Sequence, residues 1–144
     1  METIMLNNGV KMPILGYGTY QTPSRITERY VSDALSIGYR SIDTAQCYGN
    51  EREVGLACRK SGIARTELFI TTKLWVCRSY QDTLRSIEGS LNKLNMDYID
   101  LLLIHEPTGD VNEIYRASHI TILPIPILRI LRLKNVGFMR FSKS

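Results

Sequence analysis

Apolar residues follow two different spacings, and segments with one spacing alternate along the chain with segments that have the other. Short segments are almost continuously apolar or rich in β-branched residues, which is typical of strands buried in a sheet. Longer segments place apolar residues three or four positions apart, which is typical of helices that bury one face. The predicted strands are residues 14–20, 39–44, 67–74 and 97–105, and the predicted helices are residues 22–38, 50–62 and 79–95.

Turn residues mark where these elements end. Asn7, Asn8 and Gly9 separate two apolar runs, so residues 3–15 predict an N-terminal β-hairpin. Gly38 and Gly62 each follow a helical segment and predict C-terminal caps. The expected buried positions are Ile26, Tyr30, Ala34 and Leu35 in the first helix, and Leu84, Ile87, Leu91 and Leu94 in the third. Strand and helix in regular succession predict an α/β fold with a parallel sheet.

The alternation stops after residue 117. The following segment contains Pro124 and Pro126 among clustered isoleucines and leucines, and it shows neither spacing for long. It indicates an apolar, basic peptide that covers part of the sheet, because the prolines disfavour a helix on a membrane surface. We therefore predict a domain of residues 1–117 and a divergent apolar, basic tail of residues 118–144.

The net charge of +4 comes from that tail. Residues 1–117 hold 13 Lys and Arg against 14 Asp and Glu, whereas residues 118–144 hold five Lys and Arg and no acid. A nucleic-acid partner is not expected, since the folded part carries no basic surface. No run of about 18 apolar residues predicts a membrane span, and no basic leader precedes an apolar core, so we expect a cytoplasmic protein.

The three cysteines, Cys47, Cys58 and Cys77, have neither zinc-type spacing nor an even number. We interpret them as reduced thiols and expect no metal site.

Polar side chains stand at the ends of three consecutive predicted strands. Asp43, Lys73 and His105 occupy these ends, and Tyr48 lies in the loop after Asp43. The carboxyl ends of parallel strands form one face, so the four side chains should converge. Alone, each has an ordinary alternative: a turn cap, a packed tyrosine, a solvated lysine or a core histidine.

Together the four residues suit the protonation of a carbonyl oxygen. A phenol is a weak proton donor at neutral pH unless a nearby cation stabilises its phenolate, and Lys73 can be that cation while Asp43 keeps it charged. His105 can then donate a hydrogen bond to the substrate oxygen. The hydride must come from a cofactor. Gly16 and Gly18 lack the third glycine of a dinucleotide fingerprint, so a Rossmann site is not supported.

The segments "DTAQCYGNEREVG", "TTKLW" and "DYIDLLLIH", in this order after "GVKMPILGYGTY", closely resemble the aldo-keto reductase family over residues 1–117. The resemblance implies the N-terminal half of a (β/α)₈ TIM barrel, closed at its bottom by the hairpin. It also implies reduction of aldehydes and ketones with NADPH as cofactor.

The resemblance also assigns roles to individual residues. Tyr48 matches the general acid, Lys73 and Asp43 its partners, and His105 the residue that orients the carbonyl. The cofactor side would be formed by Gly18, Thr19 and Asp43, and the substrate pocket by Tyr20, Trp75 and His105.

A complete barrel needs about 250 residues. In the family, the later loops hold most of the nicotinamide and adenosine phosphate, and this chain has no clear counterpart of them. Two alternatives to a working reductase therefore stand: a catalytically silent chain that acts only by binding, and a half-barrel that associates with another copy through open sheet edges.

Overall fold

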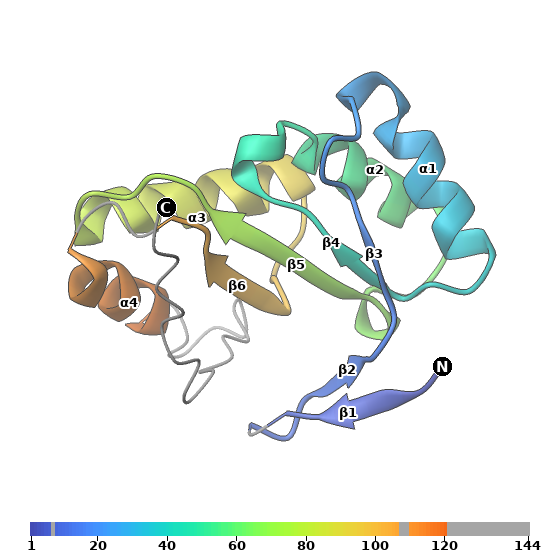
Figure 1. Cartoon of the computed structure of the whole chain (residues 1–144), viewed down its shortest axis with the longest axis horizontal. Coiled ribbons are helices and arrows are strands. Elements are labelled where there is room, and N and C mark those ends of the chain that lie inside the picture. Colours follow the sequence, from blue (N-terminus) through green and yellow to red (C-terminus); the bar gives the residue numbers. More distant parts are fainter. Residues whose placement is uncertain (7, 107–109, 121–144) are drawn as a thin grey trace, which may run out of the picture.

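The computed structural model of the chain describes residues 1–6, 8–106 and 110–120 and shows a parallel sheet covered by helices (Figure 1). A separate antiparallel hairpin, β1 and β2, precedes the four-stranded sheet, whose spatial order β3-β4-β5-β6 is also its sequence order. The strands are β1 (Thr3–Met5), β2 (Lys11–Pro13), β3 (Gly16–Gly18), β4 (Ser41–Asp43), β5 (Phe69–Leu74) and β6 (Leu101–Ile104). The helices are α1 (Ser24–Ser36), α2 (Glu51–Lys60), α3 (Tyr80–Leu94) and α4 (Val111–Ile120), with short 3₁₀ helices η1 (Gln46–Tyr48) and η2 (Arg65–Glu67). The predicted α/β fold and the hairpin are confirmed.

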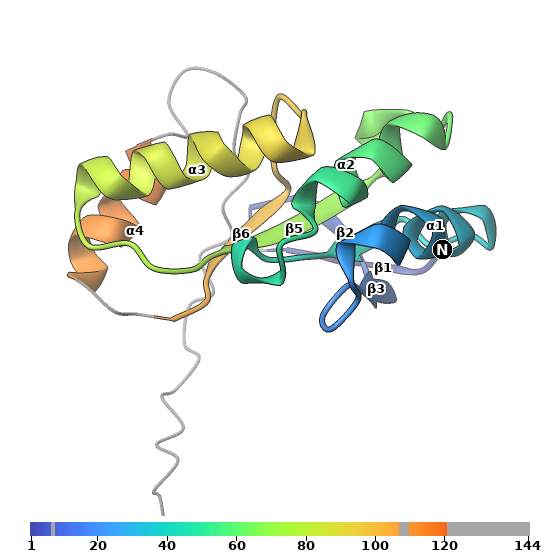
Figure 2. The same cartoon turned by 90° about the horizontal axis from the view of Figure 1, so that it is seen from above.

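The two faces of the sheet have different surroundings. Figure 2 shows α1, α2 and α3 together on one side of the strands. Alternate strand residues point to this side, and they form the main core with the helices. The strand residues of this core include Ile42, Ile70, Leu74 and Leu102. The opposite face carries the intervening residues, so polar strand residues there are not covered by the helices.

The strand register determines which residues share that opposite face. Asp43 pairs with Thr71, and Lys73, two residues further along β5, pairs with Leu103. Side chains at paired positions, and at positions two apart, lie on the same side of a sheet. Asp43 and Lys73 therefore belong to one face, and His105, two residues after Leu103, continues it.

The buried face of α1 differs from the expected one. Val31, Ala34 and Leu35 are buried as expected of an apolar stripe, but the fourth buried residue is Thr27, whereas Tyr30 is 44% exposed. Thr27 can occupy an apolar face because its hydroxyl donates to the carbonyl oxygen of Pro23 at 3.0 Å. The expectation for α1 was therefore right at Ala34 and Leu35 and wrong at Tyr30, and Ile26 is half-buried. In α3, Ile87 and Leu94 are buried, while Leu84 and Leu91 are half-buried.

The predicted glycine positions agree with the backbone. Gly38 and Gly62 follow α1 and α2 with φ angles of +110° and +72°, a region that favours glycine. Gly9 in the hairpin turn has a φ of +80°, and Asn7 lies outside the described residues.

The hairpin covers the amino ends of the strands. Phe69 and Leu101, at the starts of β5 and β6, form a second apolar cluster with Leu6, Val10 and Met12 of the hairpin region. The carboxyl ends of the strands lie at the opposite end of the sheet, away from the hairpin.

The predicted tail lies almost wholly outside the described residues, including its expected packing over the sheet. α4 runs to Ile120, past residue 117, so the change in sequence pattern does not coincide with the end of a helix. The division at residue 117 stays a prediction. Within the described ranges, no helix is both long and apolar enough to cross a membrane.

Candidate active site

The four residues expected to converge do so at the carboxyl ends of β4, β5 and β6. The ammonium group of Lys73 is their centre. It forms an ion pair with the carboxylate of Asp43 and donates to the carbonyl oxygen of Thr44 at 3.1 Å. It also lies 3.4 Å from the hydroxyl oxygen of Tyr48. The pairing of β4 with β5 places Asp43 next to Lys73, and the η1 turn places Tyr48 beside them.

The charge of Lys73 is held close to the phenol. The Lys73 side chain is only 13% exposed, against 40% for its partner Asp43. An ammonium group this far from water needs a counter-charge and hydrogen-bond acceptors, which Asp43 and Thr44 provide. The Lys73 nitrogen also lies 5.0 Å from the centre of the Tyr48 ring. A cation therefore lies directly beside the phenol oxygen.

Four rings form a row across the site. The ring centre of Tyr48 lies 5.2 Å from that of Tyr20 and 5.8 Å from that of His105, and the ring of His105 lies 5.4 Å from that of Trp75. Three of the four rings are exposed, Tyr20 by 66%, Trp75 by 41% and His105 as well, whereas Tyr48 is half-buried. A cavity of about 310 Å³ adjoins Tyr20, Cys47 and Tyr48. Its other lining residues are Gln21, Thr22 and Pro23, so the cavity lies on the Tyr20 side of Tyr48 and can accept a small molecule there.

Gly18 and Thr19, two of the three residues expected on the cofactor side, differ in placement. Gly18 is exposed, and a side chain there would meet open space. Thr19 is fully buried, and both its backbone N–H and its hydroxyl donate to the carbonyl oxygen of Asp43, at 2.9 and 3.1 Å. The side chain of Thr19 thus holds the end of β4 and does not face outward. Its expected contact to a cofactor stays a prediction.

Asn50 is a buried residue that holds the loops of the site together, and sequence analysis did not identify it. It is fully buried, and its amide nitrogen donates to the carbonyl oxygens of Thr19 and Thr22 at 3.1 and 3.0 Å. Its amide oxygen accepts from the hydroxyls of Thr44 at 2.8 Å and of Thr19 at 3.3 Å. An asparagine directly before a helix is typical of a cap, but its side chain makes no capping bond here. It instead joins the loops after β3 and β4.

Gln46 is the second supporting residue that sequence analysis did not identify. Its amide nitrogen donates to the hydroxyls of Ser86 and Ser90 at 2.9 and 2.8 Å, and its amide oxygen accepts from the backbone N–H of Trp75 at 2.9 Å. Gln46 therefore anchors the η1 turn, which carries Tyr48, to α3 and to the loop of Trp75. No local sequence signal marks these partners, since the two serines are 40 and 44 residues away.

Cys47, between Gln46 and Tyr48, is the exposed cysteine of the three. Its sulfur lies 3.2 Å from Nδ1 of His105. Loss of water around the thiol raises the pKa of Cys47 above its ordinary value, and the nearby charge of Lys73 acts in the opposite direction without reversing the shift. The thiol form is therefore favoured at neutral pH.

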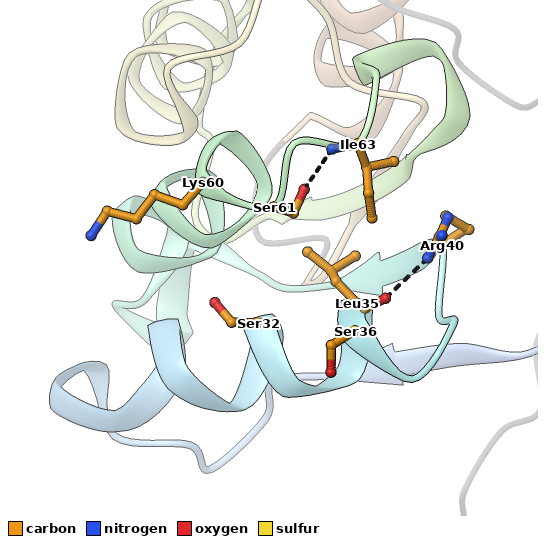
Figure 3. A pocket seen from close by; sticks show the side chains of 7 residues that line it. All are labelled: Ser32, Leu35, Ser36, Arg40, Lys60, Ser61 and Ile63. Atoms are coloured by element: carbon orange, nitrogen blue, oxygen red, sulfur yellow. Dashed lines mark hydrogen bonds between the residues drawn. The ribbon is translucent and has the colours of Figure 1, made fainter.

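A second cavity lies on the other side of the sheet. It measures about 330 Å³ between α1 and the residues after α2, and Figure 3 shows Leu35 and Ile63 pointing toward one another across it. Arg40 at its border directly precedes β4 and donates to the carbonyl oxygen of Leu35 at 3.1 Å, and Lys60 pairs with Glu28. This cavity lies near the amino ends of the strands, its Lys60 is paired with Glu28 and its Arg40 is bound to backbone carbonyl oxygens, so it is not the candidate active site.

Across the described part of the chain, no group of three or more His, Cys, Asp or Glu side chains is arranged to hold a metal ion. The polar groups gathered at the strand ends are instead a phenol, an ammonium, a carboxylate and an imidazole. This set can move a proton to an oxygen atom bound beside Tyr48.

The parallel sheet and the polar cluster at its carboxyl edge define the site of an α/β protein, and comparison with known proteins identifies the family. The sequence model of the Aldo/keto reductase family matches residues 14–133. The chain belongs to this family. The match extends beyond residue 117, the boundary predicted from the change in sequence pattern.

Curated relatives are similar over most of this chain. Morphine 6-dehydrogenase of Pseudomonas putida is 49% identical over 110 residues, which are 76% of this chain and 37% of the relative. Glyoxal reductase of Bacillus subtilis (strain 168) is 47% identical over 112 residues, 76% of this chain and 40% of the relative. Methylglyoxal reductase DkgA of Yersinia pestis is 51% identical over 104 residues, 72% of this chain and 37% of the relative.

Solved structures confirm the predicted half-barrel. An aldo/keto reductase from Brucella melitensis superposes with a TM-score of 0.83 at 44% identity, covering 90% of this chain and 51% of the other. A Bombyx mori aldo-keto reductase in complex with NADP gives a TM-score of 0.82 at 32% identity, covering 90% and 49%. The chain thus spans about half of these barrels and about two-fifths of the curated relatives.

Proposed function

We propose that this chain performs the proton transfer of an NADPH-dependent carbonyl reduction, in which an aldehyde or ketone becomes an alcohol. The observation that carries the proposal is the position of the Lys73 ammonium, which contacts both the Asp43 carboxylate and the Tyr48 hydroxyl. In this arrangement Tyr48 donates its proton to the carbonyl oxygen. Lys73 stabilises the phenolate that remains, and Asp43 keeps Lys73 charged.

The remaining site residues bind and orient the substrate. His105, beside the Tyr48 ring, donates a hydrogen bond to the same carbonyl oxygen, which fixes the carbonyl next to the proton donor. Tyr20 and Trp75, at the two ends of the ring row, contact the rest of the substrate. Two relatives are named as reductases of glyoxal and of methylglyoxal. A small carbonyl compound of this kind fits the cavity of about 310 Å³ beside Tyr48.

The residues present fit one side of a nicotinamide cofactor. A bound NADPH would supply the hydride for the carbonyl carbon. Lys73 occupies one carboxylate oxygen of Asp43, and within the described ranges no donor reaches the other, so it can accept from a ribose hydroxyl. The open space at Gly18 lets a ligand approach the backbone closely. NADPH is proposed over NADH on the family resemblance, and the NADP complex of the Bombyx mori relative supports it.

A cytoplasmic location belongs to the same proposal. All three cysteines are free, and reduced thiols are typical of the cytosol.

Oxidation of NADPH, followed by its absorbance with methylglyoxal as substrate, tests the proposal. Tyr48→Phe keeps the ring and removes the proton donor, so we expect kcat to fall by about 10² to 10⁴. Tyr30→Phe is the matched control, because Tyr30 is an exposed residue of α1, and it should leave kcat unchanged. Equal rates for Tyr48→Phe and the unmodified chain would reject Tyr48 as the acid.

A catalytically silent chain that acts by self-association is the second candidate. In the described sheet, β3 and β6 each pair with one strand only, and such edges can pair with another chain. Calorimetric titration with NADPH and sedimentation velocity separate the candidates. Micromolar NADPH binding with turnover supports the reductase. Hydrogen bonds to charged groups are worth about 1.5 to 3 kcal/mol each, so loss of two or three phosphate contacts would weaken binding by about two to six powers of ten. Binding that weak, together with concentration-dependent association, would support the silent form.

A further inference from the structure

The imidazole of His105 is contacted from behind by a thiol. Cys47 Sγ lies 3.2 Å from Nδ1, and in the described part of the chain no other hydrogen bond reaches this ring. The rings of Tyr48 and Trp75 lie edge-on to it, with interplanar angles of 84° and 68°. The imidazole packs against both rings, and in this arrangement Nδ1 is the ring nitrogen next to the sulfur.

The protonation of Nδ1 decides what the other ring nitrogen can do. In a neutral imidazole one nitrogen carries the hydrogen and donates, and the other accepts. Only a histidine with its hydrogen on Nε2 can donate from that atom to a carbonyl oxygen. The hydrogen bond made by Nδ1 selects between these two tautomers.

We propose that Cys47 is a positioning residue, whose S–H group donates to Nδ1 of His105 and thereby keeps the ring hydrogen on Nε2, directed at the substrate oxygen. The inference rests on the proposed function for the identity of that oxygen, but the tautomer itself does not depend on turnover.

The electrostatics at Cys47 favour a thiol that donates a hydrogen bond over a thiolate that acts as a nucleophile. A reactive cysteine needs a lowered pKa, whereas the pKa of Cys47 is raised, chiefly because its thiol has lost water contact. The thiol therefore keeps the hydrogen that the bond to Nδ1 requires. Formation of a disulfide between Cys47 and either of the other two cysteines is also disfavoured, since Cys58 and Cys77 are buried.

The test is a two-dimensional ¹H–¹⁵N spectrum of the full chain labelled with ¹⁵N-histidine, recorded at about pH 8, where ordinary imidazole is neutral. Protonated and unprotonated ring nitrogens have well-separated ¹⁵N shifts, so the spectrum reads the tautomer directly. The chain has two histidines, and a His119→Gln variant identifies the signals of His105. We expect the Nε2–H tautomer alone in the unmodified chain.

Three variants at one position make the result specific. Cys47→Ser keeps a donor and should preserve the Nε2–H tautomer. Cys47→Ala removes the donor and should raise the Nδ1–H population from undetectable to a measurable share. Cys47→Asp offers only acceptor atoms and should place a hydrogen on Nδ1. Because Cys47 is exposed in a turn, all three are expected to fold, and circular dichroism verifies this.

Two results would overturn the inference: a hydrogen on Nδ1 in the unmodified chain, or identical tautomer populations in the unmodified chain and Cys47→Ala. A chain that shows the Nε2–H tautomer and the expected variant series, yet has no turnover, would reject the proposed function while supporting the role of Cys47. The two failures are therefore distinguishable.

Discussion

Two glycines in neighbouring helices should respond in opposite ways to the same substitution. Gly55 in α2 lies against the last residue of α3, and a Cβ added there would be 2.0 Å from the carbonyl oxygen of Leu94 and 2.6 Å from its carbonyl carbon. Gly89 in α3 has no atom within 4 Å of the same added Cβ. Helix propensity alone favours alanine over glycine by up to about 1 kcal/mol at both positions.

Packing reverses the sign at Gly55. An ordinary contact between carbon and oxygen is about 3.3 Å, so the helices would have to separate by about 1.3 Å. The atoms in the way belong to the backbone of Leu94, a fully buried residue, and Arg59 donates to the same carbonyl oxygen at 2.7 Å. Overpacking of this kind costs about 1 to 3 kcal/mol and occasionally more. Because the clashing atoms are backbone, we take the upper end of this range and subtract the propensity gain, so we expect Gly55→Ala to lower the free energy of unfolding by about 2 kcal/mol.

Urea unfolding, followed by circular dichroism and by the fluorescence of Trp75, measures both variants. Gly89→Ala is the matched control and should raise the free energy of unfolding by about 0.5 to 1 kcal/mol. A Gly55→Ala protein as stable as the unmodified chain would show that α2 and α3 are not in the close contact described. Two variants that change in the same direction would contradict the argument equally.

Two further predictions concern buried polar groups. Asn50→Ala removes four hydrogen bonds and should lower the free energy of unfolding, measured by the same urea titration, by about 2 to 4 kcal/mol. Asn92→Ala, on the exposed side of α3, is the control and should change it by less than about 0.5 kcal/mol. Burial raises the pKa of Cys58 from 9.0 to about 11, so its contribution to stability is complete below pH 9 and is lost as the pH rises toward 11. Cys58→Ala should lose less stability than the unmodified chain over that pH interval, and parallel stability curves would contradict the assignment.

The sequence predicted the elements and the ends of the strands because both depend on neighbouring residues. Apolar spacing identified the four strands of the sheet and the helices α1, α2 and α3 but not α4, and the positions of Asp43, Lys73 and His105 followed from strand ends alone. The helix face of α1 was missed because Thr27 satisfies its hydroxyl on the helix backbone, which apolar spacing does not register. The contact between Cys47 and His105 was missed because these residues are 58 positions apart, a separation that no local pattern connects.

The proton-transfer group needs only three adjacent strands, which explains how about half of a barrel assembles it. Parallel pairing of β4 with β5, and of β5 with β6, brings the residues together. The helix layer then connects to the same strands. Glu51, 1% exposed at the start of α2, accepts from the hydroxyl of Thr72 at 2.7 Å, and Thr72 is the residue before Lys73. A displacement of α2 is therefore transmitted to β5 through this bond. Gly55→Ala should accordingly disturb the Lys73 environment even where the chain stays folded, although Gly55 itself lies on the helix side of the sheet.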